Sequence, residues 1–303
     1  MNDIYTWHND LYPLIKKRFD LRYAKRLDAI SQVCDVVCQD DIDYRIEGIG
    51  GYGEMPVYDG TTVMNADTKR TFITTITPKE HALKVTSTYK KAKLDYSGES
   101  RKIGTRLADS AYMTVLNEFY RLFGSAFTNV GSDGVAWASE KHPVSRDSKE
   151  TFSNLMHENL SVASITKAQT MASRFVTPDG LPFACNMDLL LVSPELEAKA
   201  KEICGPNSRL IPENNPDTDT NAANPVYGMK YLVVGGGNAG FTGNTWAVAD
   251  SLMLSEVLKL VYITKPTVLV SPQDNPLITD YIGYVDFAFG FGDARPIIFS
   301  NPN

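Results

Sequence analysis

The stretch SRKIGTRLADSAYMTVLNEFYRLF, residues 100–123, decides the fold class of this sequence. Its apolar residues recur every three or four positions, the spacing that places them in one stripe along a helix: Ile103, Leu107, Ala111, Val115, Phe119 and Leu122. Gly124 follows them, and glycine is typical of the position after a helix end. We therefore predict one long amphipathic helix over Ser100–Phe123, long enough to form the spine of a domain.

Helix and strand patterns are mixed after this segment. A shorter helix is predicted over Ser164–Phe175, before the turn sequence Thr177-Pro178-Asp179-Gly180. A buried strand at Asp188–Val192 precedes a helix start, with Ser193 as its cap and Pro194 in first position, and with inward-facing apolar residues at Leu196, Ala200 and Ile203. Further strand patterns occur at Tyr227–Val234, Trp246–Ala249, partly Leu252–Ile263, and once or twice within Tyr281–Phe299. The second half is therefore predicted to be α+β.

Before the long helix, apolar residues keep helical spacing from Leu11 to about Val37, with basic residues between them. The basic face could attract nucleic acid or membrane, but such a face is more commonly just solvated. Cys34 and Cys38 would share one side of this helix. We interpret them as small apolar residues, since a structural zinc site needs four ligands and no second pair has suitable spacing.

Residues 55–89 carry short strand patterns separated by polar turns. Met55–Tyr58 precedes the turn signal Asp59-Gly60, and later strand patterns cover Arg70–Ile76 and Leu83–Tyr89. An extended hairpin fits these patterns best. Because an isolated two-stranded ribbon is marginally stable in water, the body of the chain or a neighbouring molecule must support it.

The composition is that of an ordinary soluble protein. Of 303 residues, 43% are hydrophobic and 22% charged, which excludes a disordered tail or a coiled coil. The formal net charge of −6 argues against strong binding to nucleic acid. No apolar run approaches the ~18 residues of a membrane span, and the beginning lacks a signal-peptide pattern, so synthesis in the cytoplasm is expected. The four cysteines are few for a disulfide framework and are expected to be reduced.

The motif that most favours catalysis is Gly235-Gly236-Gly237-Asn238-Ala239-Gly240, which follows an apolar run and matches G-x-G-x-x-G. Dinucleotide binding needs a helix to begin at that loop, yet the next residues are poor helix formers. A glycine-rich connection between antiparallel strands explains the motif better, and a nucleotide-dependent oxidoreductase is the alternative. None of the four histidines lies in a nucleophile or zinc pattern, and Asp40, Asp41 and Asp43 lack calcium-loop spacing. We therefore expect no catalytic, cofactor or metal site.

Four segments together resemble a known family. Gly53-Glu54-Met55-Pro56-Val57-Tyr58-Asp59-Gly60-Thr61-Thr62 is similar to the hairpin start of Mu-like phage major head subunits. The other three, which occur in the family's order, are the stretch Trp137–Pro143 with Ser153–Leu155 and Leu160-Ser161, the strand-to-helix element Leu189–Glu197, and the closing strand Phe289–Arg295. The resemblance extends from about residue 50 to the C-terminus.

The resemblance implies the Hong Kong 97-type capsid fold of tailed bacteriophages. Its parts would be an N-terminal arm over residues 1–45, an extended loop over 46–97, a peripheral domain with the spine helix over 98–180, an axial domain over 181–267, and strands returning to the peripheral domain over 268–303. The glycine loop and the Asn- and Pro-rich segment 205–225 depart from the family pattern, and both would fall in the axial domain.

The function implied by the resemblance is structural. Copies would form hexamers and pentamers that close into an icosahedral head around packaged DNA, which they would contact weakly and without sequence preference. Scaffold, protease, portal and decoration proteins are expected partners, no membrane is expected, and assembly is expected in the bacterial cytoplasm. A phage-tail protein or a cargo-enclosing shell protein is the other alternative. Arm and loop would contact neighbouring subunits, through residues Tyr58, Asp59, Gly60, Lys69, Arg70, Trp7 and Phe19.

Overall fold

The computed structural model describes residues 4–26, 30–50, 53–58, 60–61, 63, 65, 71–95, 98–205 and 224–302. The chain divides into two compact units, each built from segments far apart in sequence. The first unit comprises Met1–Tyr44, Ile76–Phe119 and Lys259–Phe289. The second comprises Arg45–Thr75, Tyr120–Leu258 and Gly290–Asn303.

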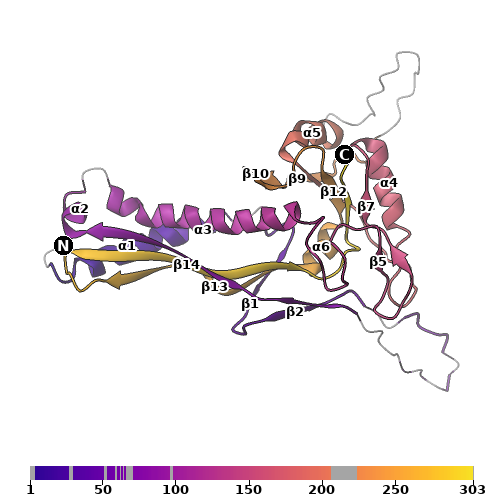
Figure 1. The fold of residues 1–303 in the computed structure, drawn as a ribbon, viewed down its shortest axis with the longest axis horizontal. Helices are drawn as coiled ribbons and strands as arrows, with labels where there is room; N and C mark the ends of the chain where they lie inside the picture. Colours follow the sequence, from indigo (N-terminus) through magenta and orange to yellow (C-terminus); the bar gives the residue numbers. More distant parts are fainter. Residues whose placement is uncertain are drawn as a thin grey trace, which may run out of the picture. The chain divides into compact units, whose positions relative to one another are not determined.

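A four-stranded sheet forms the framework of the first unit (Figure 1). Its strands, in spatial order, are β1 (Asp35–Cys38), β13 (Leu258–Pro272), β14 (Ile278–Phe291) and β4 (Lys79–Thr88). β1 runs parallel to β13, and β4 runs antiparallel to β14 over ten residue pairs, from Lys79 opposite Phe287 to Thr88 opposite Ile278. The helices of this unit pack against the long strands β13 and β14.

Two long helices, α1 (Trp7–Ala24) and α3 (Glu99–Gly124), pack against each other and the sheet in the first unit, and α2 (Tyr89–Lys93) follows β4. Residues of α1 spaced four apart join α3 and the strands in one core, comprising Trp7, Leu11, Ile15, Phe19, Tyr23, Leu107, Ala108, Tyr112, Val268 and Tyr281. The helices approach closely at Gly104, where a Cβ atom would lie 2.1 Å from the carbonyl oxygen of Ile15. A side chain there would force the helices apart.

The N-terminal helix predicted to reach about Val37 ends at Ala24 instead. Asp35–Cys38 is a strand that pairs with β13. Its β-branched residues Val36 and Val37 favour an extended backbone over a helix. Cys34 is therefore buried, whereas Cys38 is exposed on β1, so the two do not share a helical face. All four cysteines carry free thiols.

The second unit contains a five-stranded mixed sheet. Its strands, in spatial order, are β7 (Leu155–Met156), β15 (Ile297–Ser300), β12 (Trp246–Ala249), β8 (Leu189–Val192) and β9 (Lys230–Val233). β8, β12 and β15 are buried at every residue, which explains their uninterrupted apolar sequences. Helices and short strands complete the unit: α4 (Val162–Ala172), the 3₁₀ turn η1 (Pro194–Leu196), α5 (Glu197–Cys204), α6 (Ser251–Val257), β2 (Tyr44–Glu47), β3 (Ile73–Ile76), β5 (His142–Pro143), β6 (Thr151–Phe152), β10 (Gly235–Gly236) and β11 (Ala239–Gly240).

Two helix starts in the second unit differ from expectation. Ser193 does not cap the turn after β8, because its hydroxyl donates to the carbonyl of Gly243 at 2.6 Å. The apolar residues predicted to face inward after Ser193 are buried: Leu196, Ala200 and Ile203. The segment Leu252–Ile263 divides into α6 and β13, since the Asp250 carboxylate accepts from the first amides of α6 and starts a helix there.

Within the described residues, no helix has both the length and the apolar character needed to cross a lipid bilayer.

Candidate functional site

The three most exposed large apolar side chains of the described residues lie between β2 and β3. The exposed fractions are 93% for Met55, 98% for Val57, 64% for Tyr58 and 81% for Val63. We call residues 53–65 the apolar loop. The strand predicted for Met55–Tyr58 is wrong, because these residues are neither helix nor strand; Pro56 lacks the amide that a strand ladder uses. Side chains this exposed are favourably buried only against another molecule.

Hydrogen bonds join the described residues that flank the apolar loop in the sequence. The amide of Gly48, just after β2, donates to the carbonyl of Phe72, just before β3, at 2.9 Å. The next amide, that of Ile49, donates to the Asp293 carboxylate at 3.2 Å. Gly48 and Ile49, which precede the loop in the sequence, are thus bonded to Phe72, which follows it, and to Asp293.

Asp293 is held in turn by a buried arginine. The Arg295 guanidinium lies 2.6 Å from the carboxylate, and the two side chains are 4% and 8% exposed. Arg295 also donates to the carbonyls of Val176 and Val144 and lies 4.9 Å from the ring centroid of Phe152. Each of its three nitrogens donates to an acceptor of the chain, an arrangement that lets a protein bury an ion pair.

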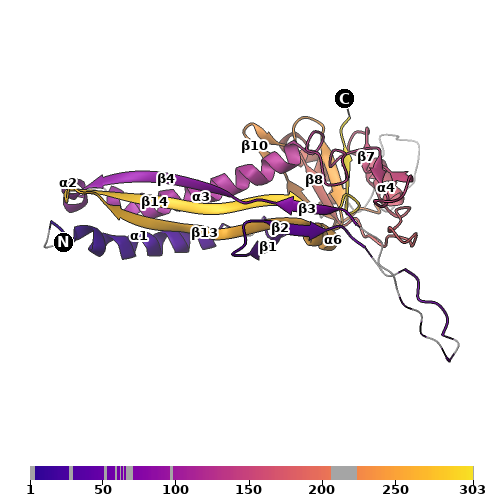
Figure 2. The ribbon, with the colours of Figure 1, turned by 60° about the horizontal axis from the view of Figure 1, so that its bottom comes forward.

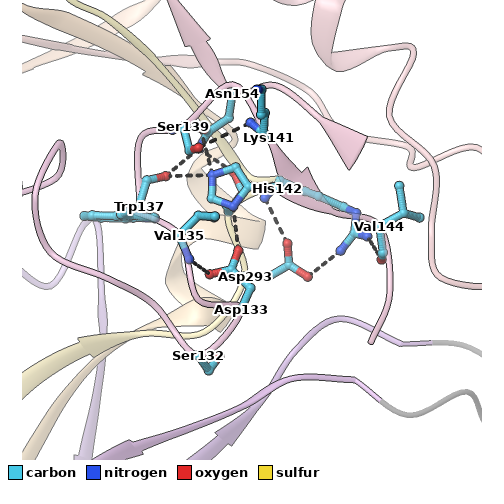
Figure 3. Close-up of polar contacts among 12 residues, drawn as sticks. Ser132, Asp133, Val135, Trp137, Ser139, Lys141, His142, Val144, Asn154 and Asp293 are labelled. Atoms are coloured by element: carbon cyan, nitrogen blue, oxygen red, sulfur yellow. Dashed lines mark hydrogen bonds and ion pairs between the residues drawn. The ribbon is translucent and has the colours of Figure 1, made fainter. Parts of the chain in front are cut away.

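A second polar cluster lies beside this pair (Figure 3). The buried His142 ring places Nδ1 2.6 Å from the Asp133 carboxylate. Its Nε2 lies 3.2 Å from the Trp137 carbonyl and 3.1 Å from the side-chain oxygen of Asn154. Asn154 donates to that same carbonyl at 2.8 Å and accepts from the Ser139 amide at 2.9 Å.

The chemistry of this cluster is structural. An aspartate–histidine pair activates a nucleophile only when the free ring nitrogen faces a hydroxyl or thiol. Here Nε2 of His142 faces a carbonyl and an amide oxygen, and only 1% of the residue is exposed. In the part of the chain that the structure describes, no three His, Cys, Asp or Glu side chains gather to hold a metal ion. The cluster instead ties Asp133, Trp137 and Asn154 together around the buried ring of His142.

The glycine motif forms a small hairpin. β10 and β11 pair antiparallel, with Gly237 at φ +61° and Gly240 at φ +94°, conformations that favour glycine. The described residues 241–245 then lead into β12 without a helix, and β9 and β12 run in opposite directions because both pair with β8, one parallel and one antiparallel. The predicted connection between antiparallel strands is confirmed, and the dinucleotide alternative has no helix N-terminus to hold a phosphate.

The residues predicted for intersubunit contact fall into three groups. Tyr58 and Gly60 are exposed in the apolar loop. Asp59, Lys69 and Arg70 lie outside the described residues. Trp7 and Phe19 are both 0% exposed in the core of the first unit, so their own chain leaves them no surface to offer a neighbour. Phe19 belongs to the apolar stripe predicted from Leu11 onward, and such a stripe is normally buried within the chain.

Sequence reasoning did not assign a role to the anchor of the loop, the Asp293–Arg295 pair. The available signal was local: two opposite charges two residues apart, directly before the apolar run Ile297-Ile298-Phe299. Charged residues beside a buried strand must find partners, which indicates an ion pair. The contact with Ile49 is not visible in the sequence, since it joins residues 244 positions apart.

Comparison with known proteins identifies the chain. A family model described as phage capsid protein matches residues 72–298. A search of curated proteins found no match. Solved structures with the same fold include the capsid of a native GTA particle, with 11% identity, a TM-score of 0.52 and coverage of 90% of this chain and 89% of that chain.

Two further solved structures agree. The procapsid of bacteriophage JBD30 has 13% identity and a TM-score of 0.50, with coverage of 97% of this chain and 76% of that chain. The structure of Microbacterium phage Oxtober96 has 10% identity and a TM-score of 0.50, covering 91% and 90%. Since the family match spans more than half of the sequence, the chain belongs to the phage capsid protein family: it is a major capsid protein of the Hong Kong 97-type fold, a structural subunit of the icosahedral shell rather than an enzyme.

Proposed function

We propose that copies of this chain assemble into hexamers and pentamers through the apolar loop, which packs on a neighbouring subunit. The observation that carries this proposal is the exposure of Met55, Val57 and Val63, each more than 80% accessible in the isolated chain. Asp293 holds the amide of Ile49, which precedes the loop in the sequence. An exposed apolar segment is suited to repeated contact with identical neighbours.

The energetics favour many modest contacts. Burying a Val or Met side chain contributes about 1.5–3 kcal/mol, and association costs several kcal/mol in lost freedom of motion. One loop is therefore a weak contact. Head-to-tail contacts between identical copies close into rings, and each ring repeats the contact around its circumference. Shell stability would then depend on protein concentration.

The finer arrangement is also part of the proposal. The arm over residues 1–45, the extended loop, the peripheral domain and the axial domain would occupy the positions implied by the family resemblance. Scaffold, protease, portal and decoration proteins would act during assembly in the bacterial cytoplasm. Packaged DNA would meet the shell weakly, which is consistent with the net charge of −6.

Serine at Met55, Val57 and Val63 is expected to prevent assembly without changing the fold. Surface substitutions usually alter folding stability by less than about 0.5 kcal/mol, so the monomer should unfold at the parent's denaturant midpoint. Sedimentation and negative-stain microscopy, with scaffold supplied, measure assembly. The matched control places serine at Ile42, Val130 and Leu252, which are 75%, 61% and 71% exposed outside the loop. Normal shells from the loop variant, or equal loss in both variants, would count against the proposal.

A further inference from the structure

Two acidic side chains face each other across the paired strands β4 and β14 of the first unit. Glu80 lies directly opposite Asp286 in the antiparallel register. Figure 2 shows the two strands side by side along their length. Directly opposed residues point to the same face of a sheet, and like charges in that position destabilise the pairing. The isolated chain therefore carries an electrostatic cost at this point.

Asp286 is the less satisfied member of the pair. It is only 7% exposed, and its Oδ1 atom has no hydrogen-bond partner. Burial and the neighbouring Glu80 raise the pKa of Asp286, while His81 partly opposes them. Glu80 is exposed and accepts a hydrogen bond from the Tyr284 hydroxyl at 2.9 Å, which raises the pKa of Tyr284 to about 12. That bond does not neutralise either carboxylate.

Another aspartate on the same face of β14 shows what a satisfied carboxylate looks like. Asp280 accepts from Thr86 at 2.6 Å and Gln273 at 2.5 Å, and lies 3.2 Å from the Lys84 ammonium. These contacts, the Thr86 hydrogen bond first, hold the pKa of Asp280 below its usual value. Asp280 and Asp286 lie six residues apart and so point to the same side. Asp280 is paired with Lys84 of its own chain, whereas Asp286 lies opposite Glu80.

We propose that Glu80 and Asp286 form a docking site for a lysine or arginine side chain of a second copy of this chain. The inference rests on the self-assembly described above. A cationic side chain would donate to the exposed Glu80 carboxylate, a strong form of hydrogen bond, and its charge would offset the repulsion between Glu80 and the buried Asp286. Among the described residues no three His, Cys, Asp or Glu side chains gather in one place to hold a metal ion. Each copy carries exposed lysines, including Lys16, Lys17, Lys90 and Lys91. A second copy can therefore supply the positive charge that the two acids lack.

The test compares Glu80→Gln with Asp20→Asn, an exposed acid on α1 with the same change of charge. Glutamine keeps an oxygen to accept from Tyr284, so the monomer should fold normally, and its melting temperature should stay equal or rise as repulsion from Asp286 is removed. The concentration needed for assembly should increase about tenfold for Glu80→Gln, the loss typical of one charge-assisted hydrogen bond. The assembly concentration of Glu80→Gln should also depend less on salt than that of the parent. The Asp20→Asn protein should assemble like the parent.

Two outcomes would overturn the inference while leaving the proposed function intact. One is a parent and a Glu80→Gln variant that assemble at the same concentration and with the same salt dependence. The other is parent assembly that stops on chelation with EDTA, returns with calcium, and loses both responses in Glu80→Gln, because the site would then bind a metal. A parent that fails to assemble under any condition would instead contradict the proposed function.

Discussion

Replacing Arg295 with methionine is expected to lower the free energy of unfolding by about 3–5 kcal/mol, the usual cost of removing one partner from a buried ion pair. The Asp293 carboxylate would remain buried without its cation, and the carbonyls of Val176 and Val144 would lose their donors. Urea denaturation below the assembly concentration measures the loss. Because Asp293 also holds the Ile49 amide, assembly should weaken as well.

The double variant Asp293→Asn/Arg295→Met separates charge from packing. Asparagine keeps an acceptor for the Ile49 amide but carries no charge, so the double variant should be more stable than Arg295→Met alone. Equal stability of the single and double variants would show that the uncompensated charge is not the source of the loss. A single variant within about 0.5 kcal/mol of the parent, the range of an ordinary surface substitution, would contradict the role of the pair.

Replacing Phe119 with alanine is expected to destabilise the chain by about 3–5 kcal/mol, as emptying a core site normally does. Phe119 is 2% exposed on α3, and its ring lies 5.7 Å from that of Phe289 on β14. Calorimetric melting of the monomer measures the loss, which here should come from the fold of the first unit and not from assembly. The control is Met113→Ala on the same helix, where the side chain is 49% exposed and the effect should be small.

A small effect of Phe119→Ala, comparable to that of Met113→Ala, would mean that α3 does not supply the core of its unit. The expected result is a large loss of stability for Phe119→Ala and an unchanged melting temperature for the variant with serine at Met55, Val57 and Val63. That result would separate folding from assembly. Residues with helical periodicity then stabilise the fold, whereas the exposed apolar loop serves assembly.

The elements that sequence reasoning predicted well have strong local signals. The helix predicted over Ser100–Phe123 is α3, with bounds one residue wider at each end, because six apolar positions keep one stripe and a glycine follows. The strand predicted at Asp188–Val192 is β8, whose uninterrupted apolar residues indicate burial on both faces. Such patterns depend on neighbours within a few residues.

The elements that were wrong depend on distant partners. Asp35–Cys38 had helical spacing but pairs with β13, more than 200 residues away along the chain. Met55–Tyr58 had strand composition but, in the described chain, forms no strand. The anchor of the loop was missed for the same reason, because Asp293 and Ile49 are brought together only by the tertiary fold. Trp7 and Phe19, which were predicted to contact neighbouring subunits, are buried in the core of the first unit.

The most direct test of the central claim, that this chain is a self-assembling shell subunit, is negative-stain microscopy of concentrated purified protein, alone and with scaffold supplied. Rings, curved sheets or closed shells built from hexamers and pentamers are the expected result, with sedimentation showing that they dissociate on dilution. Monomer alone at every concentration and salt tested, with scaffold present, would contradict the account.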